Sequence, residues 1–143
     1  MQNNLGFKLI AVMDINNLKL FKAQGLKIIE ELGKFFIHSD VNHKTERHEG
    51  FNAKKSTSSF FDPHTAPKDI EYQESSRAAV IHVSNILLEV NSPFKELCVV
   101  ADPKMLGHFR QSLSNKLKKF LTKEATKDLM NHNIADIEKA LFS

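Results

Sequence analysis

The chain has 143 residues and a mass of 16.3 kDa, which is the size of one domain. Hydrophobic residues make up 41% and charged residues 26%, as in a globular protein with a core, and five glycines and four prolines exclude a collagen-like or low-complexity fibre. No apolar run is long enough to span a bilayer, and the N-terminus lacks the pattern of a secretory signal. A lone cysteine, Cys98, cannot form an intramolecular disulfide and lies in an apolar run. We therefore expect a cytoplasmic protein without a membrane segment, in which Cys98 is buried and unreactive.

The first forty residues predict an antiparallel meander of three strands. Residues 7–13 form an apolar run of strand length that ends at a polar turn over 14–17. Residues 18–21 alternate between apolar and polar, as a half-buried strand does, and residues 26–37 continue as a third strand that is interrupted near Gly33. Short connections between consecutive strands favour antiparallel pairing.

A polar segment without periodicity follows at about residues 39–65 and predicts a long loop. We expect residues 42–60 to be poorly ordered, because they have too little apolar content to fold alone. The spacing of its histidines does not match a zinc site, and its serines 56–59 lie in no nucleophile motif. We therefore expect no metal and no cofactor here. The histidines in or beside the loop are His38, His43, His48 and His64.

The second half predicts helices and further strands. Pro67 suits the first turn of a helix, and Asp69 and Glu71 suit its positive end. This helix should end at residues 91–93, Asn-Ser-Pro. Its predicted buried stripe consists of Ala79, Val83, Ile86, Leu87 and Val90.

A central strand and a second helix come next. Residues 97–101 read as a strand that is buried on both faces, and Asp102 followed by Pro103 is a strong helix start. Gly107, in the middle of this helix, is expected to allow close packing on the sheet. The predicted buried stripe of the helix consists of Met105, Leu106, Phe109 and Leu113.

The chain closes with a strand over about 120–125 and a helix that Asn133 caps. Together these elements predict one α/β domain over residues 1–143, with a mixed sheet of about five strands and helices on its faces.

Four motifs spread over nearly the whole chain carry a resemblance to a known family. They are Val12-Met13-Asp14, Asp62-Pro63 with Lys68-Asp69-Ile70-Glu71, Val99-Val100-Ala101-Asp102-Pro103-Lys104-Met105-Leu106-Gly107-His108-Phe109-Arg110, and Lys127-Asp128-Leu129. In order and spacing they resemble the bacterial host attachment proteins, and the Pro-x-x-Leu-Gly-x-x-Arg block is the most specific. The chain departs from the family pattern at Asp102, where a small residue or proline is usual, and lacks an Arg-rich stretch after Asp14.

This resemblance implies a ribonuclease H-like fold, similar to the central domain of archaeal and eukaryotic peptide chain release factors. The release-factor domain carries a Gly-Gly-Gln loop that enters the peptidyl transferase centre. The present chain contains no Gly-Gly pair, which argues against peptide release by that chemistry.

Four carboxylates define an alternative function. Asp14 and Asp102 should lie at strand ends, with Asp69 and Glu71 near the start of a helix. Nucleases with a ribonuclease H-like fold hold two divalent ions with carboxylates in such places, so a metal-dependent nuclease or hydrolase is one hypothesis. Capping and helix-dipole roles explain the same residues without a metal, and we favour that interpretation.

Positive charge is concentrated between Lys104 and Lys127, where seven cations face one acid, Glu124. Such an excess can attract phosphate or an acidic partner, or can simply favour a helix end and a solvated surface. The leading hypothesis is a non-enzymatic binding or adaptor domain that contacts RNA or the ribosome, with an unknown protein partner as the fallback; the oligomeric state stays open. Its candidate binding residues are Lys104, Arg110, Lys116, Lys119, Lys123 and Lys127.

Overall fold

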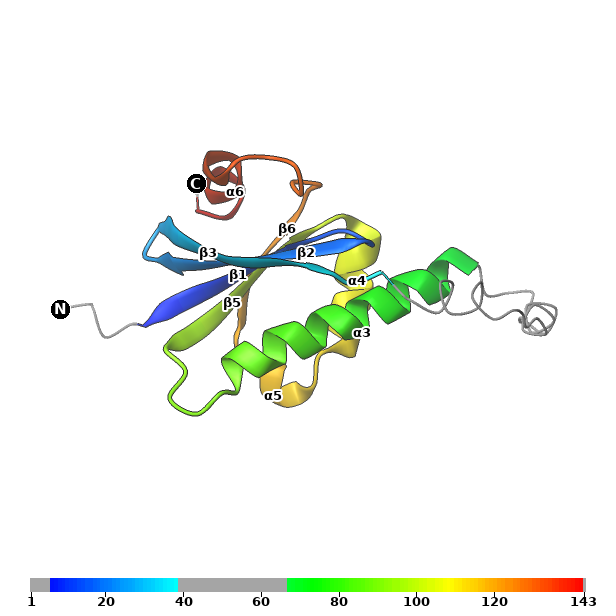
Figure 1. Ribbon diagram of the computed structural model, residues 1–143, viewed down its shortest axis with the longest axis horizontal. Helices are drawn as coiled ribbons and strands as arrows, with labels where there is room; N and C mark the ends of the chain where they lie inside the picture. Colours follow the sequence, from blue (N-terminus) through cyan, green and yellow to red (C-terminus); the bar gives the residue numbers. More distant parts are fainter. Residues whose placement is uncertain (1–5, 39–66, 143) are drawn as a thin grey trace.

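Strands and helices occur in the order that the sequence predicts (Figure 1). The structure is a computed structural model that describes residues 6–38 and 67–142, so the predictions for residues 42–60 lie outside the described residues. The elements are β1 Phe7–Met13, β2 Asn17–Gln24, β3 Lys27–Phe36, α3 Pro67–Leu87, β5 Phe94–Ala101, α4 Pro103–Ser112, α5 Asn115–Lys118, β6 Leu121–Thr126 and α6 Ile134–Phe142.

The five strands form one mixed sheet in the order β3-β2-β1-β5-β6. The chain first makes the predicted antiparallel meander, in which β1 pairs with β2 and β2 with β3. The register of the β2–β3 pair shifts between Leu20 and Phe21, next to Gly33, so the predicted interruption of the third strand is a bulge. After α3, β5 returns to lie parallel beside β1, and β6 lies parallel beside β5. This arrangement is that of a ribonuclease H-like sheet, as the resemblance implied.

Both faces of the sheet are covered, which explains why the central strands are apolar throughout. Along β1, Leu9, Ala11 and Met13 point toward α3 and α4, whereas Ile10 and Val12 point toward α6. Figure 1 shows α3, α4 and α5 on one side of the sheet and α6 on the other. Each buried aliphatic side chain of this size contributes about 1.5–3 kcal/mol through removal from water.

Cys98 lies in the core on the α6 side and is fully buried, as predicted. Desolvation raises the pKa of its thiol above the ordinary value. A thiol in this state is a poor nucleophile.

The helix starts predicted from capping residues are confirmed. Asp102 has an extended backbone, and its Oδ1 accepts a 2.8 Å hydrogen bond from the amide of Met105. Asn133 caps α6 in the same way, because its Oδ1 accepts a 3.0 Å bond from the amide of Asp136. Across the described ranges, no helix combines the length and the apolar content that a membrane crossing requires.

Two sequence predictions about the helices are wrong. Val90 does not extend the buried stripe of the long helix, because α3 ends at Leu87 and the Val90 side chain is 84% exposed. The chain then turns through Asn91, which has a positive φ of 63°. Gly107 does not pack closely on the sheet either, since a Cβ placed there would meet no atom within 4 Å. It lies on the open side of α4, away from the buried Met105 and Phe109.

Candidate functional site

The first turns of α3 lie against α4 and bring four functional side chains together. Asp69 and Tyr72 share a face of α3 because they are three residues apart, and Lys104 and His108 share a face of α4 because they are four apart. We call these four residues the α3–α4 junction. Lys104 Nζ lies 2.5 Å from Asp69 Oδ1, and His108 Nε2 lies 4.0 Å from the same oxygen.

Aromatic contacts complete the junction. The rings of Tyr72 and His108 are nearly parallel, with a 7° angle and 5.8 Å between centroids. Lys104 Nζ lies 5.7 Å from the centroid of the Tyr72 ring, within the range of a cation–π contact. Tyr72 thus contacts both groups that approach Asp69.

Electrostatics at the junction follow from this geometry. Contact with the Lys104 ammonium lowers the pKa of the Asp69 carboxyl, although desolvation opposes the shift. The same contact raises the pKa of Lys104. Desolvation, followed by the charge of Asp102, raises the pKa of the Tyr72 hydroxyl, and Asp14 and Asp69 act in the same direction. At neutral pH the junction therefore holds a closed ion pair beside a protonated phenol.

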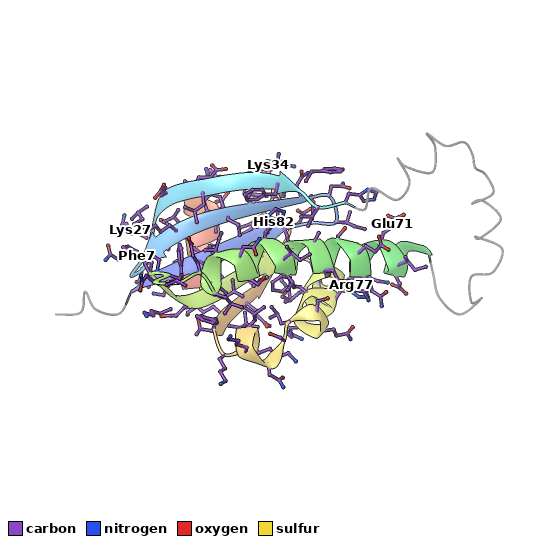
Figure 2. All side chains as sticks on the ribbon, turned by 60° about the horizontal axis from the view of Figure 1, so that its bottom comes forward. Phe7, Lys27, Lys34, Glu71, Arg77 and His82 are labelled. Atoms are coloured by element: carbon purple, nitrogen blue, oxygen red, sulfur yellow. The ribbon has the colours of Figure 1, made fainter. Side chains whose placement is uncertain are left out.

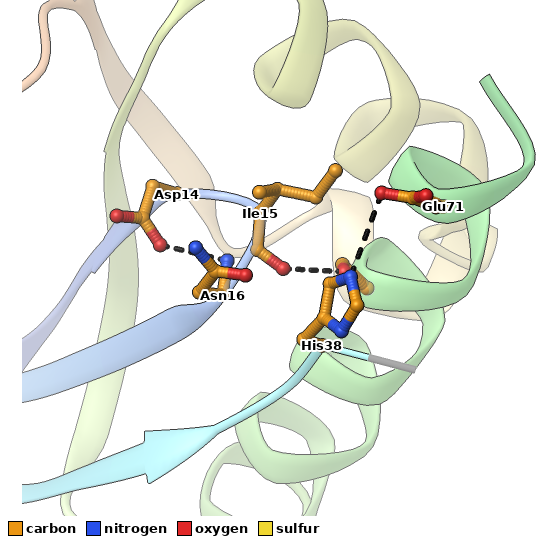
Figure 3. Close-up of polar contacts among 6 residues, drawn as sticks. Asp14, Ile15, Asn16, His38 and Glu71 are labelled. Atoms are coloured by element: carbon orange, nitrogen blue, oxygen red, sulfur yellow. Dashed lines mark hydrogen bonds and ion pairs between the residues drawn. The ribbon is translucent and has the colours of Figure 1, made fainter. Parts of the chain in front are cut away.

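The two strand-end carboxylates lie near this junction but are used by the backbone. Asp14 Oδ1 accepts a 2.8 Å hydrogen bond from the amide of Asn16 (Figure 3) and a 2.7 Å bond from the amide of Asn17, and the two bonds fix the β1–β2 turn. Asp102 Oδ1 caps α4. Both carboxylates therefore have the structural role that the capping interpretation gave them.

The fourth predicted carboxylate, Glu71, faces the end of β3. Its Oε1 lies 3.5 Å from His38 Nε2, and one turn further along α3 the Ser75 hydroxyl donates a 2.6 Å hydrogen bond to the carbonyl of Ile15 (Figure 3). These contacts fasten α3 to the sheet. Within residues 6–38 and 67–142, no three His, Cys, Asp or Glu side chains converge as a metal-binding group. Among the described residues, the four candidate carboxylates therefore do not form such a group.

The predicted basic cluster is divided by the fold into paired and unpaired cations. Lys104 pairs with Asp69, and Arg110 makes a bidentate pair with Glu124 through bonds of 2.9 and 2.6 Å. The Arg110 guanidinium lowers the pKa of Glu124. These two cations therefore add little net charge to the surface.

Three lysines on the short helix α5 and at its C-cap have a different environment. Lys116, Lys118 and Lys119 are exposed, and none of them has an ion pair in the described part of the chain. We call them the α5 lysines. The two remaining candidates lie elsewhere: Lys123 is on β6 opposite Cys98, and Lys127 lines a pocket beside α6. The sequence cluster is therefore not one surface, because its members lie on both sides of the sheet.

Sequence reasoning did not single out Tyr72 or His108. Their signal was available only as spacing, since Asp69–Tyr72 and Lys104–His108 are helical neighbours. That the two pairs meet depends on how α3 packs against α4, which no local pattern contains.

Comparison with known proteins places this α/β domain in a family. A family model described as "Protein required for attachment to host cells" matches residues 9–141. "Uncharacterized protein RP470" of Rickettsia prowazekii (strain Madrid E) is 40% identical over 139 residues, which cover 95% of this chain and 93% of that protein. The chain therefore belongs to the family of proteins required for attachment to host cells, as the motifs indicated.

Two solved structures align with much of this chain. An "Archaeal protein" aligns with a TM-score of 0.53 and 13% identity over 97% of this chain. The archaeal translation termination factor aRF1 aligns with a TM-score of 0.47 and 14% identity over 88% of this chain. The present chain spans only 36% and 31% of the lengths of these two structures. The first likeness supports the fold and nothing further.

Proposed function

We propose that this chain is a non-enzymatic binding domain that holds RNA phosphates on the α5 lysines. The observation that carries the proposal is the concentration of Lys116, Lys118 and Lys119 within four residues, exposed and without ion pairs in the described part of the chain. Unpaired cations are the ones that can exchange condensed counterions of a nucleic acid for contacts of their own.

The local structure supports a binding role for these lysines. The Ser114 side chain accepts a 3.3 Å hydrogen bond from the amide of Leu117, and the Leu117 side chain is buried. The helix is therefore anchored by its cap and by one apolar side chain, while its cationic side chains are in water. Exposed lysine ammonium groups contact phosphates as point charges and do not read base edges, so we expect little sequence preference.

A binding role is also favoured over catalysis by the state of the polar groups. Asp14 and Asp102 accept backbone hydrogen bonds, and Asp69 pairs with Lys104. The carboxylate-based metal chemistry of the alternative hypothesis needs carboxylates that are available to an ion or a substrate. The α5 lysines, in contrast, are exposed to water and available for a binding partner.

The test is the salt dependence of binding to a single-stranded RNA oligonucleotide, measured by fluorescence anisotropy between about 50 and 200 mM salt. Each phosphate contact contributes a slope of about −0.7 in log affinity against log salt concentration. The variant Lys116→Gln/Lys119→Gln should therefore flatten the slope by about 1.4. Its melting temperature should not change, because surface substitutions shift stability by less than about 0.5 kcal/mol.

A matched control is Lys27→Gln/Lys34→Gln, which removes the same charge from β3 at the opposite edge of the sheet from β6. This control should keep the wild-type slope. Equal flattening in both variants would mean that only net charge matters. Absence of RNA binding at about 50 mM salt, where attraction is strong, would reject the proposal and leave an unidentified protein as the partner.

A further inference from the structure

A second polar site lies between α3 and α4, on a different part of the surface from the α5 lysines. It is a pocket of about 230 Å³ lined by Gln73 and Arg77 of α3 and by His108, Gln111 and Ser112 of α4. Figure 2 shows Arg77 on α3 beside α4. His108 belongs both to this pocket and to the α3–α4 junction, so the pocket continues the junction along the two helices.

The lining supplies hydrogen-bond donors and no carboxylate. Arg77 presents a guanidinium with five N–H donors, Gln73 and Gln111 present amide groups, and Ser112 presents a hydroxyl. Unlike Lys104 and Arg110, Arg77 has neither an ion pair nor a hydrogen bond among the described residues. The Arg77 guanidinium is permanently charged and can donate two parallel hydrogen bonds, and an oxyanion can accept both.

His108 adds an unused polar atom at the same place. Its Nε2 faces Asp69 at 4.0 Å, and its Nδ1 is buried without a hydrogen-bond partner in the described part of the chain. Buried nitrogens of this kind are normally paired. His108 is therefore a pocket-lining side chain with a hydrogen-bonding atom that the described residues leave unused.

The charge and the volume of the pocket restrict the kind of ligand that it can bind. The C-terminal end of α4 carries a partial negative charge of about half a unit, which the full charge of Arg77 exceeds. A volume of 230 Å³ is below the range of about 300–1,000 Å³ for drug-sized ligands, and it accommodates a single small group with its water. We propose that the α3–α4 pocket binds an oxyanion of the phosphate type, either as inorganic phosphate or as the end group of a small phosphomonoester.

The experiment titrates the full chain with inorganic phosphate at constant ionic strength, with chloride as the balancing anion, and follows the amide and side-chain NMR signals. Saturable shifts should appear at Arg77, His108 and Gln111. Glycerol 3-phosphate in a parallel titration separates the two sources: tighter binding than inorganic phosphate assigns the pocket to phosphomonoesters, and weaker binding assigns it to the free ion.

Two variants decide whether the pocket is responsible. Arg77→Gln should weaken phosphate binding by roughly ten- to a hundredfold, which is the factor that corresponds to the loss of a hydrogen bond to a charged group. Arg77→Lys keeps the positive charge but loses the two parallel N–H donors. Its phosphate affinity should therefore lie between those of the wild type and Arg77→Gln. Lys116→Gln/Lys119→Gln should bind phosphate as the wild type does, which separates this site from the proposed RNA surface. Equal affinity in Arg77→Gln and wild type, or shifts that do not saturate, would overturn the inference.

Discussion

The cations of α4 and the α5 lysines follow one another in the sequence, but the fold gives their charges different surroundings. On α4, Lys104 pairs with Asp69 of α3 at the α3–α4 junction, and Arg110, further along the helix, pairs with Glu124 of β6. On α5, Lys116 and Lys119 meet no carboxylate among the described residues. Cations of the first kind are already compensated, and only those of the second kind give the surface a positive potential.

A run of like charges in a sequence therefore predicts a positive surface only where the fold leaves those charges without ion-pair partners. Exposed ion pairs such as Arg110–Glu124 stabilise the fold little. Because Lys104 and Arg110 are paired, the cations of the run that have no ion pair in the described part of the chain lie on α5 and its C-cap, on β6 and after β6. The following predictions separate the two regions, beginning with the largest expected effect.

Removal of the α4 cap should affect the junction and leave α5 unchanged. Asp102→Ala deletes the acceptor for the Met105 amide and should lower the free energy of unfolding by about 1 kcal/mol, within a range of 0.5–2. Chemical denaturation measures the loss. Asp102→Ser, which keeps a cap, should recover most of it, and RNA affinity should be the same in all three proteins. A drop in RNA affinity for Asp102→Ala would show that the two regions are coupled.

Gly107 offers a gain in stability beside the junction. A Cβ at this position meets nothing within 4 Å, so Gly107→Ala should raise the free energy of unfolding by roughly 0.5–1 kcal/mol through its better helix propensity. Gly25 is the matched control, because it is equally open but has a φ of +63°. There, alanine should destabilise the protein. Loss of stability in Gly107→Ala would mean that the glycine has a packing role after all.

Acidification should remove the stability that the paired cations Lys104 and Arg110 provide, and this change in stability should be smaller than those at Asp102 and Gly107. The pKa values of Asp69 and Glu124 are lowered in the folded state, chiefly by Lys104 and Arg110. A lowered carboxyl pKa gives stability that is present above the unfolded-state pKa of about 4 and is lost as the pH falls through the folded-state value.

The measurement is the melting temperature against pH, compared between wild type and Lys104→Gln/Arg110→Gln. The difference between these two proteins should be present at neutral pH, vanish at strongly acidic pH and shrink in high salt. Lys116→Gln/Lys119→Gln should show no such pH-dependent difference. A difference that persists unchanged into acid would assign the stabilisation to something other than these ion pairs.

Most of the fold was predictable because it is encoded locally. The apolar run of β1, the stripe on α4 and the caps at Asp102 and Asn133 each depend on neighbouring residues only. The end of α3 was placed too late because Val90 continues the helical spacing, whereas the turn at Asn91 requires the chain to leave the helix earlier.

The candidate site was predictable only in part. The sequence singled out Asp69, Lys104 and Arg110 as candidate site residues, but it did not predict that they form ion pairs, because their partners come from other elements. The α3–α4 pocket could not be predicted, since Arg77 and Gln111 lie on two helices whose packing angle is set by the core beneath them.

The most direct test compares the salt slope of RNA binding in three proteins: wild type, Lys116→Gln/Lys119→Gln and Lys104→Gln/Arg110→Gln. Both variants lose two positive charges, but they differ in the position of those charges and in whether the charges were paired. The slope should flatten by about 1.4 when the α5 lysines are replaced, at about 0.7 for each lost phosphate contact, and should keep the wild-type value when the paired cations are replaced. Equal flattening in the two variants, or flattening only in the second, would contradict the claim that the α5 lysines form the binding surface.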